Sequence, residues 1–234
     1  MKPPSFNLVE LLGRVEHFKR LLEADRVAIV NAGQVRAFSA GATIYREGES
    51  AAGMFVLLSG HVHLLKLGPQ GQQSIVAEFD PIIMFNEVTV LDGGANLTTA
   101  IAVQACVTWN IQPAAFQALL QRDPTIGLGL LRVLAARMRN LMAQYEDVSF
   151  RSVLARTAKL LLDLSARGAQ PIQRQEYPNA DLAARISTVP EAVSRSLQVF
   201  RKNGDITCTR ATITVNQPAT LEKFAQVEKG VVSL

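Results

Sequence analysis

The chain has 234 residues, of which 48% are hydrophobic, 19% charged and 6% aromatic, a composition that argues against a disordered or fibrous protein and suits one large or two small domains. Its longest apolar run, residues 51–58, is far shorter than the roughly 20 residues that span a bilayer, and the first residues lack a signal-peptide pattern, so we expect a cytoplasmic protein without a membrane partner. Residues 148–234 carry a net charge of +5, from 12 Lys and Arg and 7 Asp and Glu, whereas the rest of the chain carries −1. This basic C-terminal third favours a polyanionic partner.

The N-terminal part of the chain is predicted to be helical and the part that follows to form β-strands. Residues 7–30 place apolar side chains at mixed spacings of three and four, which predicts one or two helices. From residue 34 to about residue 112 the chain changes to short β-rich runs separated by Gly, Pro and Asp. Strands this short and this closely spaced predict a compact β-barrel or jelly roll. Turn signals at 68–72 and 91–96 fall where hairpins would reverse direction.

Pro113 opens a helical pattern, and a second, longer helix is predicted from residue 123 to about residue 150. Apolar residues recur along it at alternating spacings of three and four, the pattern of a two-stranded coiled coil. This predicted dimer seam consists of Leu131, Leu134, Met138, Leu141, Tyr145 and Val148. The alternative is a helix that lies only on its own β-domain, which needs a single apolar stripe. A second apolar face favours a dimer seam with an intramolecular face behind it; that face consists of Leu128, Leu130, Val133, Ala135 and Met142.

A further helix is predicted over residues 151–167, closed by Gly168. After a polar connection, Asn179 can cap a short helix over residues 180–186, with Asp181 in its first turn, where the helix dipole favours an acidic side chain.

A tight break at residues 187–189 leads into the next helix, which runs from Pro190 to a stop at Gly204. Thr188 and Glu191 have the spacing of a capping box at its start. Two short helices joined by such a turn form the DNA-reading helix-turn-helix. Residues 205–217 then predict a β-hairpin wing, and residues 219–230 a terminal helix.

Three polar residues share one face near the start of this second helix: Glu191, Ser194 and Arg195. The N-terminal half of a recognition helix reaches base edges, where Arg pairs with guanine, Glu accepts from cytosine and Ser bonds to either kind of edge. The alternative is a solvated face with a Glu–Arg pair that contributes about 0.2–0.5 kcal/mol. The surrounding helix-turn-helix, in the basic part of the chain, favours base contacts. Thr188 and Arg201 are candidates for phosphate contacts.

The order of parts resembles the CRP/FNR family of bacterial transcription regulators. The resemblance rests on residues 38–51, 54–62, 85–87 and 181–195, together with the long seam helix. It implies an α+β fold with three parts: a β-roll (jelly-roll) sensor domain over residues 1–122, a dimerisation helix over 123–150 and a winged helix-turn-helix over 151–234. Family members bind palindromic promoter sites as homodimers and act on RNA polymerase.

Within the family, the motif formed by Glu191, Ser194 and Arg195 resembles the FNR branch, whose half-sites are of the TTGA kind. Pro190, directly before the Glu, departs from that pattern and can alter the reading of neighbouring bases. In oxygen-sensing FNR proteins an N-terminal cysteine cluster holds iron and sulfur, but Cys106 and Cys208 are the only cysteines here and cannot supply four thiolates. We expect both to be buried and inert.

The sensor domain departs from the cyclic-AMP branch, in which a Gly-Glu pair and an Arg-Ser pair hold ribose and cyclic phosphate. The positions that match this effector pocket are Asn86, Glu87, Leu97, Thr98, Leu141 and Met142, the last two being those that meet adenine. Only Glu87 and Thr98 have compatible chemistry. Without the Arg, a buried phosphate would lack its counter-charge, which argues against cyclic AMP.

Haem is one candidate cofactor, because haem-dependent, nitric-oxide-responsive regulators of this branch also lack the cysteines and the phosphate Arg. A pocket with Leu97, Leu141 and Met142 as its walls would suit haem or another apolar effector. His61 and His63 alternate with apolar residues, so both point to one face of a strand, close enough to share a metal. A polar outer face of the β-roll is the favoured interpretation of this pair.

Two rival functions stay open. One is a constitutive regulator whose pocket is filled by its own side chains, and the other is a cyclic-nucleotide receptor module whose output is not DNA. An enzyme is not expected, because the sequence has no P-loop, nucleophile–base pair or metal triad with usable spacing.

Overall fold

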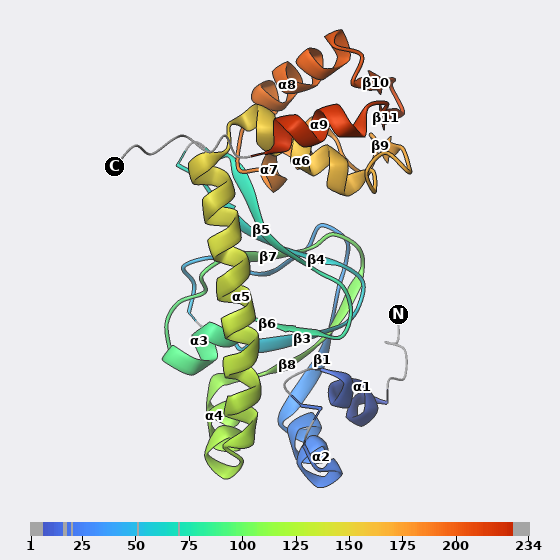
Figure 1. The fold of residues 1–234 in the computed structure, drawn as a ribbon. Helices are drawn as coiled ribbons and strands as arrows, with labels where there is room; N and C mark the ends of the chain where they lie inside the picture. The colour runs from blue at the N-terminus through green and yellow to red at the C-terminus, as the bar shows by residue number, and fades with distance from the viewer. Residues whose placement is uncertain (1–6, 16–17, 20, 51, 70, 227–234) are drawn as a thin grey trace, which may run out of the picture. The chain divides into compact units, whose positions relative to one another are not determined.

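The computed structural model describes residues 7–15, 18–19, 21–50, 52–69 and 71–226. The chain divides into two compact units, the first formed by residues 1–66 and 76–139 and the second by residues 67–75 and 140–234. The first unit combines two β-sheets with several helices, whereas the second is mainly helical (Figure 1). This confirms the expected α+β fold with an N-terminal jelly roll, a long helix and a C-terminal helix-turn-helix.

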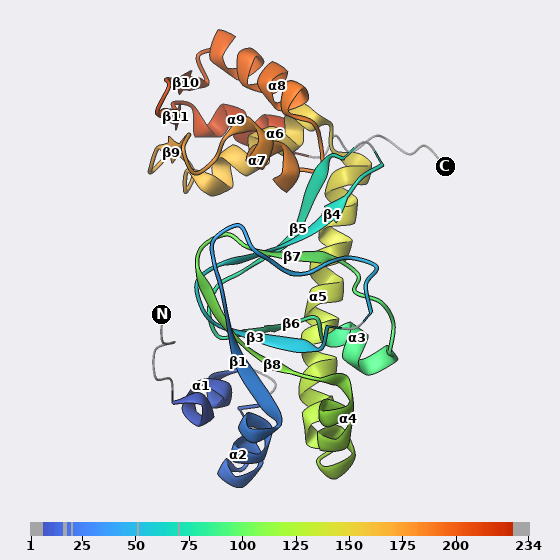
Figure 2. The same cartoon turned by 180° about the vertical axis from the view of Figure 1, so that it is seen from behind.

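The first unit contains two four-stranded sheets that face each other as layers (Figures 1 and 2). One sheet has the strand order β1-β8-β3-β6, with bounds Gly33–Phe38, Cys106–Ile111, Met54–Ser59 and Ile83–Phe85. The other has the order β2-β7-β4-β5, with bounds Thr43–Tyr45, Thr99–Ala102, Val62–Leu67 and Gln73–Phe79. Seven of these strands lie in the predicted β-rich runs. Strand β6 and the short helix α3 (Glu87–Asp92) that follows it were not predicted from the sequence.

An apolar core fills the space between the two sheets. Its aromatic side chains stack on one another, with ring centroids 5.3 Å apart for Phe55 and Phe85 and 5.6 Å apart for Tyr45 and Phe55. Val62 and Leu64 of β4 point into the same core. The interior of the jelly roll is therefore occupied by the protein's own side chains.

A second core lies on the other side of the first sheet, under helices α1 (Leu8–Arg14) and α2 (Glu23–Ala32). These two helices confirm the prediction for residues 7–30. Trp109 of β8 is fully buried here, and its indole Nε1 donates a hydrogen bond to the carbonyl of Val30, 3.3 Å away. A side chain at Gly33 would meet the Trp109 ring at 2.4 Å, so only glycine lets α2 pass into β1 so closely over the indole.

Helices α4 (Pro113–Arg122) and α5 (Thr125–Phe150) follow β8, the last strand of the jelly roll, as predicted. Only the first turns of α5 are buried: Ile126 and Leu130 are each 1% exposed and pack into the core around Trp109. Of the predicted intramolecular face, Leu130 is buried and Val133 is half-buried, whereas Leu128, Ala135 and Met142 are exposed. The second apolar face is therefore less buried than predicted.

In the second unit, α5 is followed by α6 (Val153–Leu164), whose N-cap Ser152 accepts a hydrogen bond from the Ala155 N–H at 3.1 Å. A three-stranded sheet of order β10-β11-β9 packs with α6 and the later helices around one apolar core. The wing hairpin, β10 and β11, was predicted, and the two-residue strand β9 was not. The bounds of the elements after α6 are Ile172–Gln173 for β9, Asn179–Arg185 for α7, Pro190–Lys202 for α8, Ile206–Cys208 for β10, Thr212–Val215 for β11 and Pro218–Ala225 for α9. Among the described residues, no helix combines the length and apolar character needed to cross a membrane.

Candidate functional site

The helix-turn-helix consists of α7 and α8, which pack through buried apolar residues. Leu182 and Ile186 on one side face Val193, Leu197 and Phe200 on the other, all within the core of the second unit.

Hydrogen bonds fix the turn between α7 and α8. The Thr188 N–H donates to the carbonyl of Ala183 at 3.0 Å, and Ser187 adopts a left-handed conformation with φ of 51°. From α6, the Arg156 guanidinium donates to the carbonyl of Ile186 at 2.6 Å. Burial lowers the pKa of Arg156, and the charge of Asp147 opposes that shift. The angle between the two helices thus depends on a half-buried cation as well as on apolar packing.

Both predicted N-caps are wrong. The N-cap of α8 is Val189, and no side chain caps the helix, so Thr188 and Glu191 do not form a capping box. Pro190 forces the preceding residue into an extended conformation, which moves the start of the helix one residue along, and the Thr188 N–H is already bonded to α7.

For α7, Pro178 occupies the cap position and Asn179 is the first helical residue. The Asn179 side-chain oxygen instead accepts a hydrogen bond from Arg174 at 2.8 Å. Asp181 does lie in the first turn, and it pairs with Arg185 through an Nε–Oδ2 contact of 2.6 Å.

The face of α8 predicted to contact bases is open to solvent. Glu191 and Arg195 are exposed and Ser194 is half-buried. In the part of the chain that the structure describes, no ion pair or hydrogen bond engages the side chain of Arg195, so its guanidinium is available for a partner. Arg201 is exposed and Thr188 half-buried, both at the margins of this face.

The exposed polar face of α8 extends further along the helix than the sequence analysis predicted. Gln198 and Lys202 are also exposed and continue the same face from Arg195 at spacings of three and four. Arg210, at the tip of the wing, is exposed as well. The wing turn is held by Thr209, whose hydroxyl accepts hydrogen bonds from the N–H groups of Ala211 and Thr212 at 3.1 and 2.9 Å. The same helical spacing, extended by two turns, could have identified Gln198 and Lys202.

In the sensor unit, Glu87 lies at the start of α3 with only 1% of its surface exposed. Its Oε1 is paired with the guanidinium of Arg137 from α5, which also donates to the carbonyl of Met84. The same guanidinium lies 5.1 Å above the centre of the Phe79 ring. The other carboxylate oxygen, Oε2, is buried and has no hydrogen-bond partner among the described residues. Arg137 was not singled out from the sequence because its partner is 50 residues away.

Asn86 holds the backbone around this site. It adopts a left-handed conformation with φ of 63°, and its side-chain amide donates to the Gly53 carbonyl at 2.8 Å and to the Asn96 side chain at 3.0 Å. Asn96 is 2% exposed and donates in turn to the Arg46 carbonyl at 3.0 Å. Asn86 thus orders the loop and Glu87 contacts α5, while a role of either residue in effector binding stays a prediction.

The other predicted pocket residues are less enclosed. Leu97 is 57% exposed, and its carbonyl accepts a hydrogen bond from Lys66 at 3.1 Å, whereas Thr98 is half-buried. Leu141 and Met142, at 51% and 54% exposure, belong to the second unit. An apolar pocket with walls of Leu97, Leu141 and Met142 stays a prediction.

The two cysteines are free thiols in different places. Cys106 is 2% exposed in β8, and Cys208 is half-buried in the wing. Burial raises the pKa of both thiols, in Cys208 against the charges of Arg174 and Arg201. A raised pKa disfavours the reactive thiolate.

Two family models match the chain, the cyclic nucleotide-binding domain at residues 35–123 and the Crp-like helix-turn-helix domain at residues 155–224. Among related proteins, the cyclic AMP receptor protein of Thermus thermophilus is 29% identical over 192 residues, which cover 82% of this chain and 88% of that protein. A CRP-like cAMP-activated global transcriptional regulator of Mycobacterium tuberculosis is 25% identical over 222 residues, 93% of this chain and 99% of that protein.

Solved structures agree with these matches. The catabolite activator protein of Thermus thermophilus is similar at 27% identity with a TM-score of 0.54, covering 90% of this chain and 98% of that one. A putative regulator of the crp/fnr family from Eubacterium rectale shares the fold at 16% identity, with a TM-score of 0.75 and coverage of 89% and 96%. The chain therefore belongs to the CRP/FNR family of transcription regulators, with a cyclic nucleotide-binding domain followed by a DNA-binding helix-turn-helix domain.

Proposed function

We propose that this regulator acts as a cytoplasmic homodimer that binds a palindromic TTGA-type promoter site and acts on RNA polymerase from there. The observation that carries the proposal is the solvent-exposed Arg195 on α8, which has no side-chain partner among the described residues and lies in line with Glu191 and beside Ser194. Arg195 would contact guanine, Glu191 would accept from cytosine, and Ser194 would bond to a neighbouring base edge.

The homodimer is proposed from the surface of α5. Five of the six seam residues are exposed in the single chain, and the largest values are 67% for Met138 and 63% for Leu131 and Tyr145. A continuous exposed apolar stripe at heptad spacing is typical of a helix that pairs with a partner helix. A second copy would present the same stripe and place the two recognition helices on successive half-sites.

A signal other than cyclic AMP is proposed from the charges near Glu87. Position 97 is Leu rather than Arg, and the cation nearest to Glu87 in the described residues, Arg137, is already engaged by that carboxylate and by the Met84 carbonyl. A cyclic phosphate would have to be buried without a free counter-charge, which costs several kcal/mol.

Two modes of control remain candidates, each favoured by one observation. The stacked rings of Tyr45, Phe55 and Phe85 fill the space between the sheets and favour a regulator that needs no effector. The buried Glu87 Oε2, which lacks a partner among the described residues, favours an effector that carries a hydrogen-bond donor. Haem stays a candidate for an effector that binds beside Leu97, Leu141 and Met142, and a nucleotide receptor whose output is not DNA is the least favoured candidate.

The first experiment is equilibrium binding of the purified, untreated protein to a TTGAT-N4-ATCAA duplex, with a scrambled duplex as competitor and the salt concentration varied. Selective binding without additives supports the operator and the effector-independent mode. Binding that becomes selective only after haem is added, with a Soret band, supports haem control. Calorimetry with cyclic nucleotides separates the remaining candidate: heat of binding to cyclic AMP would contradict the proposed signal. Equal affinity for both duplexes under all these conditions would contradict the proposed operator.

A further inference from the structure

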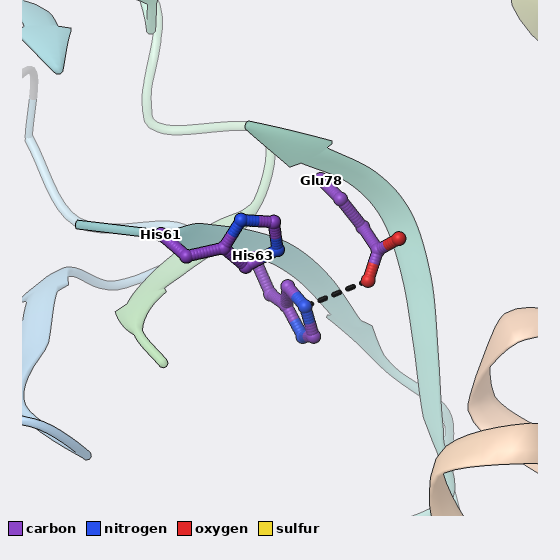
Figure 3. A group of neighbouring side chains, drawn as sticks. All are labelled: His61, His63 and Glu78. Carbon is purple, nitrogen blue, oxygen red and sulfur yellow. Dashed lines mark ion pairs between the residues drawn. The ribbon is translucent and has the colours of Figure 1, made fainter. Parts of the chain in front are cut away.

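Two histidines and a glutamate gather on neighbouring strands of the second sheet. His63 lies in β4, His61 directly precedes that strand, and Glu78 comes from β5. Figure 3 shows the two imidazoles next to each other, with the Glu78 carboxylate facing His63 across the strands. Because Val62 and Leu64 point into the core, the histidines between and beside them face the outside of the sheet.

The potential ligand atoms of these three side chains all lie within 4.8 Å of one another. His63 Nε2 is 2.7 Å from Glu78 Oε1, and the two imidazole centroids are 5.2 Å apart in an edge-on arrangement. The two histidine side chains are half-buried, with 24% of His61 and 12% of His63 exposed, and Glu78 lies at the exposed edge of the group with 31% of its side chain exposed.

Asp80 completes the arrangement from the outside. Its Oδ1 lies 2.9 Å from His61 Nδ1. A carboxylate on one ring nitrogen fixes the tautomer of an imidazole and leaves the other nitrogen free as a ligand, which is the usual outer partner of a metal-bound histidine. With Nδ1 turned to Asp80, His61 keeps Nε2 as its ligand atom.

We propose that His61, His63 and Glu78 form a binding site for one divalent transition-metal ion, with Zn²⁺ the best match. Two imidazoles and one carboxylate are a preferred ligand set for zinc, in which a fourth position stays open for water or another donor. The ion would take the place of the contact between His63 Nε2 and Glu78 Oε1, and a neutral His63 would then carry its single ring proton on Nδ1. These two atoms would separate by about half an ångström, since two ligands on zinc at about 2.0–2.1 Å each lie further apart than a hydrogen bond allows.

The alternative is two ordinary ion pairs on a polar outer face, His63 with Glu78 and His61 with Asp80. Those pairs would hold each histidine separately and give the site no affinity for metal. The metal site does not rest on the proposed operator or effector, so it can be tested without DNA.

The test uses the full-length chain without an affinity tag, stripped of metal, in competition with a chromophoric zinc chelator. We expect one Zn²⁺ per chain, no such binding after His61→Ala with His63→Ala, and about 10-fold weaker binding after Asp80→Asn. Cys208→Ser is the matched control and should keep the wild-type affinity. Unchanged Trp109 fluorescence in each variant would show that the sheets remain folded.

Cobalt provides an independent measurement. Co²⁺ in the same site should give d–d absorption without a thiolate charge-transfer band, because nitrogen and oxygen supply the ligands. Wild-type protein that holds zinc no more tightly than the double histidine variant would overturn the site. A thiolate band that disappears with Cys208→Ser would also overturn it, by placing the metal on cysteine.

Discussion

Arg137 on the long helix α5 is paired with Glu87, a carboxylate with 1% of its surface exposed, at the start of α3. The same guanidinium reaches the Met84 carbonyl and lies over the ring of Phe79. One side chain therefore links the helix that carries the proposed dimer seam to β5, β6 and α3. An effector that displaces Arg137 from Glu87 Oε1 would break this link and change how α5 is held.

Replacing Arg137 with Ala should destabilise the sensor domain by about 3 kcal/mol, because Glu87 would remain buried without its counter-charge. The free energy of unfolding can be measured by urea denaturation followed through Trp109 fluorescence. The double variant Arg137→Met with Glu87→Gln is the control and should recover most of the loss, since both charges are then absent. A single variant as stable as the wild type would contradict the importance of the pair.

Replacing Arg195 with Ala should weaken binding to the specific duplex by about 1–3 kcal/mol and relax the preference at one base pair of each half-site. Lys202→Ala serves as the comparison, because an exposed lysine on the same helix is suited to a phosphate contact. It should weaken binding to all duplexes alike and reduce the salt dependence by about one unit. Equal losses on specific and scrambled DNA for Arg195→Ala would argue against base contact.

Placing a charge in the seam should separate the proposed dimer. Met138→Glu introduces a carboxylate at a position that is 67% exposed in the single chain, so the fold of the chain should survive while the coiled coil does not. Sedimentation velocity should show a monomer at concentrations where the wild type is a dimer. Arg132→Glu, exposed on the same helix but outside the seam, should stay dimeric. A wild type that is monomeric at every concentration would contradict the proposed homodimer.

The stability of the DNA-binding domain should depend on Asp147 in a defined pH range. Burial raises the pKa of Asp147, but hydrogen bonds from Lys159 and Arg151 outweigh it and leave the pKa below its usual range. The stabilisation is complete above the unfolded pKa of about 3.9 and is lost as the pH falls through the lower, folded pKa.

Urea denaturation followed by circular dichroism at several pH values tests this dependence. Asp147→Asn should be less stable than the wild type at neutral pH, and the difference should shrink towards zero in acid. Asp163→Asn, which changes an exposed carboxylate on α6, should show no comparable difference. A constant gap between Asp147→Asn and the wild type across the acid range would contradict the assignment.

The two polar residues before α6 and α8 should differ in what they stabilise. Ser152→Ala removes the cap of α6 and should cost about 1 kcal/mol in the free energy of unfolding. Thr188→Ala removes no cap and should cost less than about 0.5 kcal/mol, while it weakens binding to DNA if the hydroxyl contacts a phosphate. Thermal denaturation and DNA binding of both variants check this. A larger loss of stability for Thr188→Ala than for Ser152→Ala would contradict the prediction that Thr188 caps no helix.

Regular elements could be predicted from the sequence where a pattern repeats within one segment. The spacing of apolar residues along α5 and the Pro190-to-Gly204 signals of α8 gave both helices nearly at their observed bounds. Strand β6 is only three residues long, and the six-residue helix α3 begins after a left-handed Asn86. Neither element is long enough to show a repeating spacing of apolar residues in the sequence.

The site was predicted only in part for a related reason. Glu191, Ser194 and Arg195 lie on one helix, and helical geometry alone places them together. Arg137 and Glu87 meet because β6, α3 and α5 fold around the same core, and no local spacing records that contact. The N-caps of α7 and α8 were displaced by Pro178 and Pro190, whose fixed φ decides where a helix begins.

Trp109 is the only tryptophan in the chain, and it is fully buried beneath β1 and α2. Its emission therefore reports on the sensor domain alone, whereas helical circular dichroism reports on helices in both units. When the two signals are recorded in one denaturation series, they resolve whether the domains unfold together or in sequence. The single tryptophan thus allows the unfolding of the sensor domain to be followed separately from that of the DNA-binding domain, without an added label.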